Sequence, residues 1–303
     1  MQKLPKMPKK ATIVSGIALV LLLALIITLT AAAGSRSKAE NESAEALPKR
    51  VSVLFPELNE IRMMKYEDFL CGCVAGLLSD IPDNTEIPPE AVRAIAIAEN
   101  SRAAYYLKNK NPSESFGADL TVGEDLPFIE CENKAISQAV TGLPLLTYGG
   151  EAFNAQICRI SAGVTDEAPP YSPSVPLLCD VSAKGYSSSI AFTYETVRRA
   201  LRQNAVSQNF EEWFHDPVYA ETGTLIYIGF CDTRVTGSAL KLALGLRSTA
   251  ITVEYRDQKF YFNCKGLGEN RGMSINAAIF LAQNGKTDEE ILKLFYPQAE
   301  LKY

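Results

Sequence analysis

The sequence PPEAVRAIAIAENSRAAYYL, residues 88–107, contains the clearest element that can be predicted in this chain. Alanine and other apolar residues recur at helical spacing after its second proline, and aromatic residues stand near its end. Proline is tolerated at a helix start because the first helical N–H groups have no partner within the helix. The pattern therefore predicts a helix over residues 90–107.

Shorter helices and strands are predicted on both sides of this helix. The expected helices cover residues 67–78, 131–140, 194–203, 236–245, 274–284 and 288–294. The expected strands cover residues 51–55, 144–150 (ending in a turn), 152–160, 224–230, 249–255 and 259–263. Helices and strands intermix without a regular βαβ period, so we expect one α+β domain over residues 51–303.

The N-terminal region carries a second strong pattern. Residues 13–29 are uncharged and almost entirely apolar, and a helix needs about 20 such residues to cross a bilayer. Four lysines in residues 1–10 precede this run, so the positive-inside rule places the N-terminus in the cytoplasm. We expect a cytoplasmic basic tail over 1–10, a single transmembrane anchor over 11–33, and an extracytoplasmic domain held at the cell membrane.

A cleaved signal peptide is the alternative for this segment, because Ala31–Gly34 resembles a small-residue cleavage site. The apolar core is longer than the roughly 7 to 15 residues of a typical signal. Residues 34–50 are small, polar and charged, which predicts a flexible linker. With either an anchor or a signal peptide, the domain is exported.

Composition limits the chemistry of the domain. The net charge is −5, and the lysines and arginines are scattered beyond residue 10, so no nucleic acid partner is expected. The chain has seven cysteines without a Cys-x-x-Cys pair and a single histidine, His215, so we expect no metal site and no cofactor. An odd number of cysteines leaves at least one unpaired, which argues against a dedicated disulfide framework. Free cysteine is often buried, so we expect most to be buried small hydrophobes, with one or two disulfides possible in an exported domain, and we do not expect Cys71 to pair with Cys73.

Four stretches cover most of residues 64–303. They are YEDFLCGCVAG (66–76); PEAVRAIAIA (89–98); AISQAVTGLPLLTYGGEA (135–152) with SAGVTD (161–166); and LGLRST (244–249) with GLGENRGMSINAA (266–278) and ILKLFYP (291–297). In their sequence and in their order, these stretches resemble the family of stage II sporulation protein D and the LytB amidase enhancer. The resemblance implies a membrane-anchored protein that acts on peptidoglycan during engulfment, as a lytic transglycosylase does.

The residues that carry the family's chemistry are replaced in this chain. The family's acid, the glutamate of Gly-x-Val-Ala-x-Glu-Met, falls on Leu77, and leucine carries no proton. The histidine and glutamine of its late motif fall on Glu269 and Ile275, and its Arg-Thr-Tyr becomes Asn-Ser-Arg over 100–102. The family's candidate metal-binding segment has no counterpart between residues 104 and 131. This pattern favours binding or scaffolding without cleavage.

The late glycine-rich stretch supplies the candidate site. We expect Gly268, Glu269, Gly272 and Ser274 to contact substrate, with Glu269 as a weak catalytic candidate. Each has a structural alternative: the glycines allow special backbone geometry, Ser274 caps the next helix, and Glu269 is a surface acid. Met273 is expected in the core, and His215 is expected in an aromatic turn with a structural role.

Three functions remain open at this point. The first is a wall-associated sporulation protein that binds peptidoglycan glycan strands, or a partner such as a cell-wall hydrolase or engulfment protein, without cutting. The second is a glycan-cleaving enzyme whose acid has moved to Glu269 or to the loop with Asp80, Asp83 and Glu86. The third is a structural subunit of a membrane complex.

Overall fold

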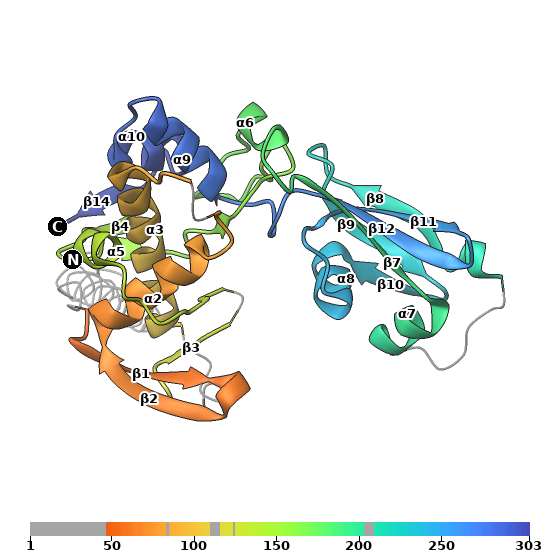
Figure 1. Cartoon of the computed structure of the whole chain (residues 1–303), viewed down its shortest axis with the longest axis horizontal. Coiled ribbons are helices and arrows are strands. Elements are labelled where there is room, and N and C mark those ends of the chain that lie inside the picture. The colour runs from red at the N-terminus through yellow and green to blue at the C-terminus, as the bar shows by residue number, and fades with distance from the viewer. Residues whose placement is uncertain (1–46, 83–84, 110–115, 124, 203–208) are drawn as a thin grey trace, which may run out of the picture. The chain divides into compact units, whose positions relative to one another are not determined.

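The computed structural model describes residues 47–82, 85–109, 116–123, 125–202 and 209–303, and these form a mixed helix and strand fold (Figure 1). The α+β class predicted from the sequence is therefore confirmed. The basic tail, the predicted anchor and nearly all of the predicted linker lie outside the described residues. Among the described residues, no helix has both the length and the apolar character that crossing a membrane requires.

Helix α3 (Pro89–Lys108) lies at the centre of the first hydrophobic core. Its side chains are buried from Ala91 to Ala104 with only Arg93 partly exposed, because other elements contact it on nearly every side. The neighbouring helices are α2 (Tyr66–Leu78), α5 (Lys134–Ala139), α9 (Ile275–Gln283) and α10 (Asp288–Phe295). These five helices agree with the predicted ones to within three residues at each end.

Short sheets complete the first core. Strand β1 (Arg50–Phe55) pairs antiparallel with β2 (Glu60–Lys65) and parallel with β3 (Leu120–Thr121). Strand β4 (Leu145–Tyr148) lies between β14 (Glu300–Lys302) and β5 (Glu151–Ala152). The strand predicted over 152–160 is wrong in extent, since only β5 and β6 (Ile157–Cys158) form there. Strand β6 pairs in parallel with β13 (Met273–Ser274).

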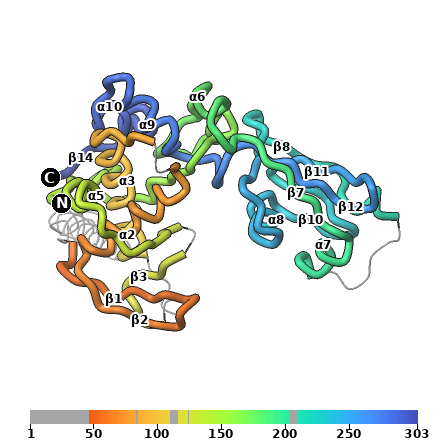
Figure 2. Tube along the Cα trace, viewed as in Figure 1, coloured from red at the N-terminus to blue at the C-terminus, as the bar shows by residue number. Residues whose placement is uncertain are grey.

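The second hydrophobic core is built by residues 187–265, which follow α6 (Leu178–Val181) and precede β13 in the sequence (Figure 2). One sheet has the order β11-β12-β7 and another the order β10-β9-β8. The strands are β7 (Ser187–Phe192), β8 (Phe214–Tyr219), β9 (Leu225–Phe230), β10 (Thr233–Thr236), β11 (Ala250–Arg256) and β12 (Lys259–Lys265), with helices α7 (Tyr194–Ala200) and α8 (Gly237–Leu244). Aromatic side chains fill this core, with Trp213 stacked on Phe260 and at right angles to Phe230.

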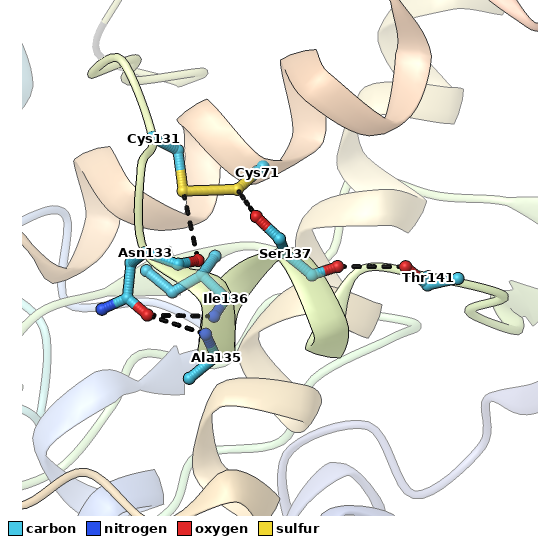
Figure 3. Close-up of a disulfide and its surroundings, with 7 residues drawn as sticks. All are labelled: Cys71, Cys131, Asn133, Ala135, Ile136, Ser137 and Thr141. Atoms are coloured by element: carbon cyan, nitrogen blue, oxygen red, sulfur yellow. Dashed lines mark hydrogen bonds between the residues drawn. A yellow bond between two sulfur atoms is a disulfide. The ribbon is translucent and has the colours of Figure 1, made fainter.

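A disulfide joins Cys71 of α2 to Cys131, just before α5 (Figure 3). Asn133 follows Cys131 and caps α5 by accepting from the backbone N–H of Ala135 at 2.9 Å, and Ser137 Oγ donates to Cys71 Sγ at 3.4 Å. The other five cysteines are free, and Cys73, Cys158 and Cys264 among them are buried. The expectation that most cysteines are free, and that Cys71 and Cys73 do not pair with each other, is confirmed.

Candidate functional site

The position onto which the resemblance places the family's acid is apolar in this fold. Leu77, in the last turn of α2, is only 6% exposed and belongs to the first hydrophobic core. On the same helix, Gly72 and Gly76 lie so close to residues 127 and 128 that a Cβ at either glycine would overlap that segment. This end of α2 is therefore closed by packing.

Of the acid candidates in the loop after α2, Asp80 is held in an ion pair. Arg159 donates from Nη2 to the carbonyl oxygen of Gly76 at 2.9 Å and forms an ion pair with Asp80. An arginine at this place also complements the negative end of the α2 dipole. Burial, and secondarily the charge of Arg247, lower the pKa of Arg159 from its ordinary value. Glu86 is exposed, and Asp83 lies outside the described residues.

The late glycine-rich stretch has structural roles at three of its four candidate positions. A Cβ at Gly272 (φ +68°) would overlap the carbonyl oxygen of Gln156, and one at Gly268 (φ +114°) would lie 3.1 Å from Cys158 Cβ. Ser274 is buried and caps α9 by accepting from the N–H of Ala277 at 3.2 Å. The helix cap expected at Ser274 is confirmed, as is the core position of Met273, which is 0% exposed.

Glu269 differs from these three residues because its side chain contacts α8. Its Oε2 accepts from Ser238 Oγ at 2.7 Å, and its Oε1 is 3.2 Å from Nζ of Lys241, so it is bound to α8. Its side chain is 36% exposed. The carboxylate therefore carries a cation and a hydroxyl as partners, and its contact with substrate stays a prediction.

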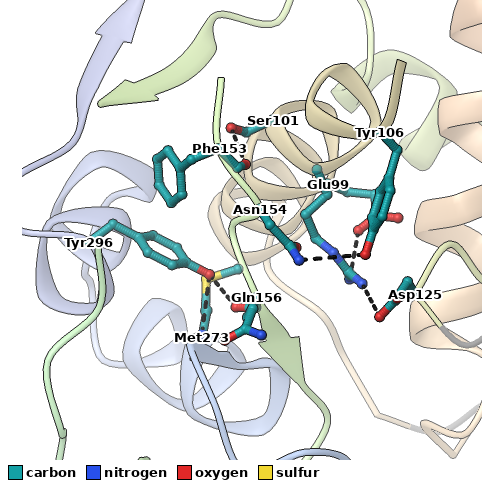
Figure 4. Close-up of polar contacts among 10 residues, drawn as sticks. Glu99, Ser101, Tyr106, Asp125, Phe153, Asn154, Gln156, Met273 and Tyr296 are labelled. Carbon is teal, nitrogen blue, oxygen red and sulfur yellow. Dashed lines mark hydrogen bonds and ion pairs between the residues drawn. The ribbon is translucent and has the colours of Figure 1, made fainter. Parts of the chain in front are cut away.

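A polar cluster around α3 was not predicted from the sequence. We call it the α3 polar cluster, and it comprises Glu99, Arg102 and Tyr106 of α3 with Asp125 and Asn154. Figure 4 shows its polar contacts. Glu99 is 0% exposed, and its Oε2 accepts from Arg102 Nη1 at 3.1 Å. Arg102 Nη2 lies 3.7 Å from Oδ1 of the exposed Asp125, and Asn154 Nδ2 donates to the Tyr106 hydroxyl at 3.5 Å. The cluster thus connects a buried carboxyl to the surface.

Three buried atoms of this cluster have no hydrogen-bond partner among the described residues: Glu99 Oε1, Arg102 Nε and Asn154 Oδ1. Burial raises the pKa of the Glu99 carboxyl, and the neighbouring Arg102 offsets only part of that effect. Burial, followed by the charge of Asp125, also raises the pKa of Tyr106. Buried polar atoms without a hydrogen-bond partner lower the stability of a fold, and groups with perturbed pKa values cluster at functional sites. The cluster is therefore a candidate functional site.

A pocket of about 390 Å³ lies against the cluster and shares Asn154 with it. The Tyr296 hydroxyl forms part of its wall, donating to the carbonyl oxygen of Gln156 at 2.5 Å and accepting from the N–H of Met273 at 3.2 Å. Glu167 and Arg271 bring both signs of charge to the lining, and Tyr171 adds a ring. Such a lining is suited to a polar ligand.

One signal in the sequence could have found the cluster. Glu99 and Arg102 are spaced i and i+3 in a stretch of α3 that is otherwise rich in alanine and isoleucine. Charged residues on a helix buried all round must pair with each other, and that spacing allows it. The helix was predicted, but Arg102 was interpreted only as part of the replaced Arg-Thr-Tyr motif over 100–102, and its pairing with Glu99 was not predicted.

His215 lies on strand β8, so the turn predicted around it is wrong. Its ring covers Gly229 of β9, where a Cβ would overlap it, and its Nε2 is 3.0 Å from the carbonyl oxygen of Cys231. That carbonyl, and then the Asp216 carboxylate 3.0 Å from Nδ1, raise the pKa of His215. Over the part of the chain that the structure covers, no group of three or more His, Cys, Asp or Glu side chains could hold a metal ion.

Comparison with known proteins gives a consistent group of relatives, although no protein-family model matches the chain. The chain is 22% identical over 289 residues to stage II sporulation protein D of Bacillus subtilis, covering 86% of this chain and 81% of that protein. It is 23% identical over 281 residues to stage II sporulation protein D of Bacillus amyloliquefaciens, covering 84% and 79%. An uncharacterised protein of Brachyspira hyodysenteriae is 25% identical over 263 residues, covering 81% and 70%.

Proposed function

Since this chain belongs to the family of stage II sporulation protein D, we propose that it is a cell-wall protein of sporulation that binds glycan strands without cutting them. The observation that carries the second half of this proposal is Leu77. Cleavage of a glycosidic bond needs a proton donor at the leaving oxygen. Leu77 occupies the family's acid position within the apolar core, and Asp80 nearby is held in an ion pair with Arg159.

The proposal includes an anchor over residues 11–33 and a domain outside the cytoplasm. The lysines before the apolar run support this orientation. The disulfide between Cys71 and Cys131 supports it independently, because disulfides form and persist in oxidising compartments and are rare in the cytosol.

Incubation of the full-length chain, purified in detergent, with glycan strands tests the proposal. Two substrates are used, strands with stem peptides and strands stripped of them, and an active lytic transglycosylase serves as the positive control. We expect the chain to sediment with the strands and to release no anhydro-sugar products. Release at a rate comparable to the control enzyme would overturn the non-cleaving assignment.

Glycan cleavage remains the second candidate function, and one observation favours it. Glu99 is a carboxyl whose pKa burial raises, and Asn154 beside it lines the 390 Å³ pocket. Enzymes raise the pKa of a general acid in this way. Substrate could reach Glu99 only if side chains that cover it moved, because Glu99 has no exposed surface.

The substitution Glu99→Gln separates the two candidates if the chain does release product. Loss of release by roughly 10²- to 10⁴-fold in Glu99→Gln, with Glu269→Gln unchanged, would assign the acid to Glu99. Loss in Glu269→Gln alone would assign it to the late motif instead.

A further inference from the structure

A second pocket, of about 650 Å³, lies on the open face of the sheet β11-β12-β7. Successive side chains of a strand point to opposite faces, so register decides what forms its floor. Thr252, Asn263 and Ser189 are partners across the three strands and share this face. The alternate residues, Ile251 and Cys264, belong to the hydrophobic core, and Cys264 also contributes to the lining of the pocket. The floor of the pocket therefore presents a row of hydroxyl and amide groups, with Ala250 and Cys264 beside it.

A second row widens this polar floor. Lys265 and Ser187 are partners in the next exposed register, beside Ala250. Both side chains are exposed, and Lys265 has no acidic partner among the described residues. Asn263 Oδ1 accepts from Ser189 Oγ at 2.7 Å. That bond uses only the oxygen of the amide, so the two N–H donors of Asn263 can serve a ligand. The floor thus offers donors, acceptors and one cation.

The turn over residues 220–223 forms one wall of the pocket, together with Tyr219 at the end of β8, whose side chain is 39% exposed. Two hydrogen bonds fix the turn. Thr222 Oγ1 donates to the carboxylate of Asp166, and the N–H of Gly223 donates to the carbonyl oxygen of Ala220 at 2.9 Å. An exposed aromatic ring beside such a fixed turn can stack on the apolar face of a sugar ring.

Asn270, which is 1% exposed, links two of the segments that line the pocket. Its Oδ1 accepts from the N–H of Ala162, a lining residue outside the sheet, at 2.8 Å. Its Nδ2 donates to Thr224 Oγ1, next to the turn, at 2.9 Å and to the carbonyl oxygen of Val164 at 3.0 Å. One buried side chain thereby fixes Ala162 relative to the turn before any ligand arrives, which lowers the cost of binding.

We propose that this pocket, which is distinct from the family's acid position and from the α3 polar cluster, binds an acetamido sugar of the glycan strand. Hydroxyls and amides on the floor pair with the sugar's hydroxyl and acetamido groups, and Tyr219 covers its apolar face. Lys265 binds a carboxylate on the sugar. The inference rests on the proposed function, because it names the place where glycan is held.

Calorimetric titration of the full-length chain in detergent tests the site with two probes. One probe is chitotetraose, a neutral tetramer of N-acetylglucosamine, and the other is glycan strand stripped of stem peptides, which carries muramic carboxylates. In Asn263→Ala we expect affinity for both probes to fall about tenfold, since hydrogen bonds to the sugar are lost. In Lys265→Gln we expect about a tenfold loss for the stripped strand and little change for chitotetraose.

Lys259→Gln is the matched control, because Lys259 is an exposed lysine on the same strand, outside the pocket. It should bind both probes as the wild-type chain does. If the wild-type chain binds neither probe, glycan binding itself is overturned. If the wild-type chain binds the stripped strand, and Asn263→Ala and Lys265→Gln bind it equally well, the proposed function stands and this pocket is not its site.

Discussion

Leu77 is the residue at which this chain departs most clearly from an enzyme of its family. Returning a carboxyl there, as Leu77→Glu, places a polar group in a position that is 6% exposed. We expect a loss of stability on the order of 3 kcal/mol at pH 7 and no release of anhydro-sugar. Burial raises the pKa of the introduced carboxyl, so the loss should shrink as the pH falls toward the ordinary glutamate range.

Denaturant unfolding at pH 7 and at pH 5 measures this loss, with Leu77→Met as the volume-conserving control. The control should lose less than about 1.5 kcal/mol at both pH values. A stable Leu77→Glu chain that cleaves glycan would show that the site is still an open catalytic cleft.

The ion pair of Glu99 and Arg102 gives a second prediction at this scale. Arg102→Met leaves Glu99 buried without a cation, and we expect a loss of about 3–5 kcal/mol at neutral pH. Because the pKa of Glu99 is raised in the folded state, the stability tied to its neutral form is present below its ordinary pKa of 4.5 and is lost as the pH rises. The loss in Arg102→Met should therefore be smaller at pH 5 than at pH 8.

The double variant Arg102→Met/Glu99→Gln supplies the control, since neutral glutamine removes the unpaired charge. It should recover most of the stability and abolish the difference between the two pH values, as measured by thermal unfolding. Equal losses at pH 5 and pH 8 in Arg102→Met would contradict a raised pKa at Glu99.

At the scale of elements, the sequence predicted those helices and strands whose periodicity is set by burial on one face or all round. Helix α3 is the best example, because alanine and other apolar residues recur at helical spacing over residues 90–107, and a segment of that length favours a helix over a strand. Strand β8, Phe214–Tyr219, was missed because it contains Pro217 and a register shift, and Asp216 has φ +47°. Such a segment resembles a turn until its partner strand is known.

The candidate site was predictable to a similar degree. The helix cap at Ser274 follows from residue type and position, which a sequence displays directly. The pairing of Glu99 with Arg102 could not be singled out as a candidate site from the sequence, because its burial depends on the distant segments that pack around α3. The sugar pocket depends on the register of three strands, with Ser189 far from Asn263 in the chain.

Gly272 gives the prediction for the junction of β13 with β6. A Cβ there would overlap the carbonyl oxygen of Gln156, which accepts from the N–H of Met273 at 3.0 Å and from the Tyr296 hydroxyl. We expect Gly272→Ala to lose at least about 3 kcal/mol, because the backbone contact cannot relax without breaking these bonds. Gly245→Ala is the control: its φ of +61° is similar, but among the described residues no atom beyond its neighbours along the chain comes within 4 Å of the added carbon.

The control should cost only the backbone conformation, about 1–2 kcal/mol. Thermal unfolding of both variants, with circular dichroism to confirm the fold, separates the two effects. Equal losses would mean that the close approach to Gln156 adds nothing and that only the sign of φ matters.

For the whole molecule, residues 187–265 are added to the first core as a continuous insertion, between α6 and β13. This arrangement leaves the first core dependent on segments from both ends of the folded region, since α9 and α10 pack on α3. The inserted residues supply the sheet face and the turn of the proposed sugar pocket, with Ala162 outside them, while the position that the resemblance gives to the family's acid, Leu77, lies on α2. In our proposal, binding and cleavage therefore draw on different parts of the chain, which would allow cleavage to be lost while glycan binding is kept.

The topology of the whole chain gives the last prediction, which the cysteines can test without a fusion protein. If the domain is exported, Cys71 and Cys131 are oxidised, and the other five cysteines are free. Cells are lysed in denaturant with a thiol-reactive mass tag, and the tags on the full-length chain are counted with and without prior reduction. We expect five tags before reduction and seven after, matching the seven cysteines of the chain.

A variant with the four lysines before residue 11 changed to glutamine and an arginine cluster added after residue 33 should invert the anchor, because the positive charge then lies on the other side of the apolar segment. That variant should carry seven tags under both conditions, since reducing thiols in the cytosol prevent the disulfide. Seven tags on the unaltered chain before reduction would place the domain inside the cell and overturn the proposed orientation.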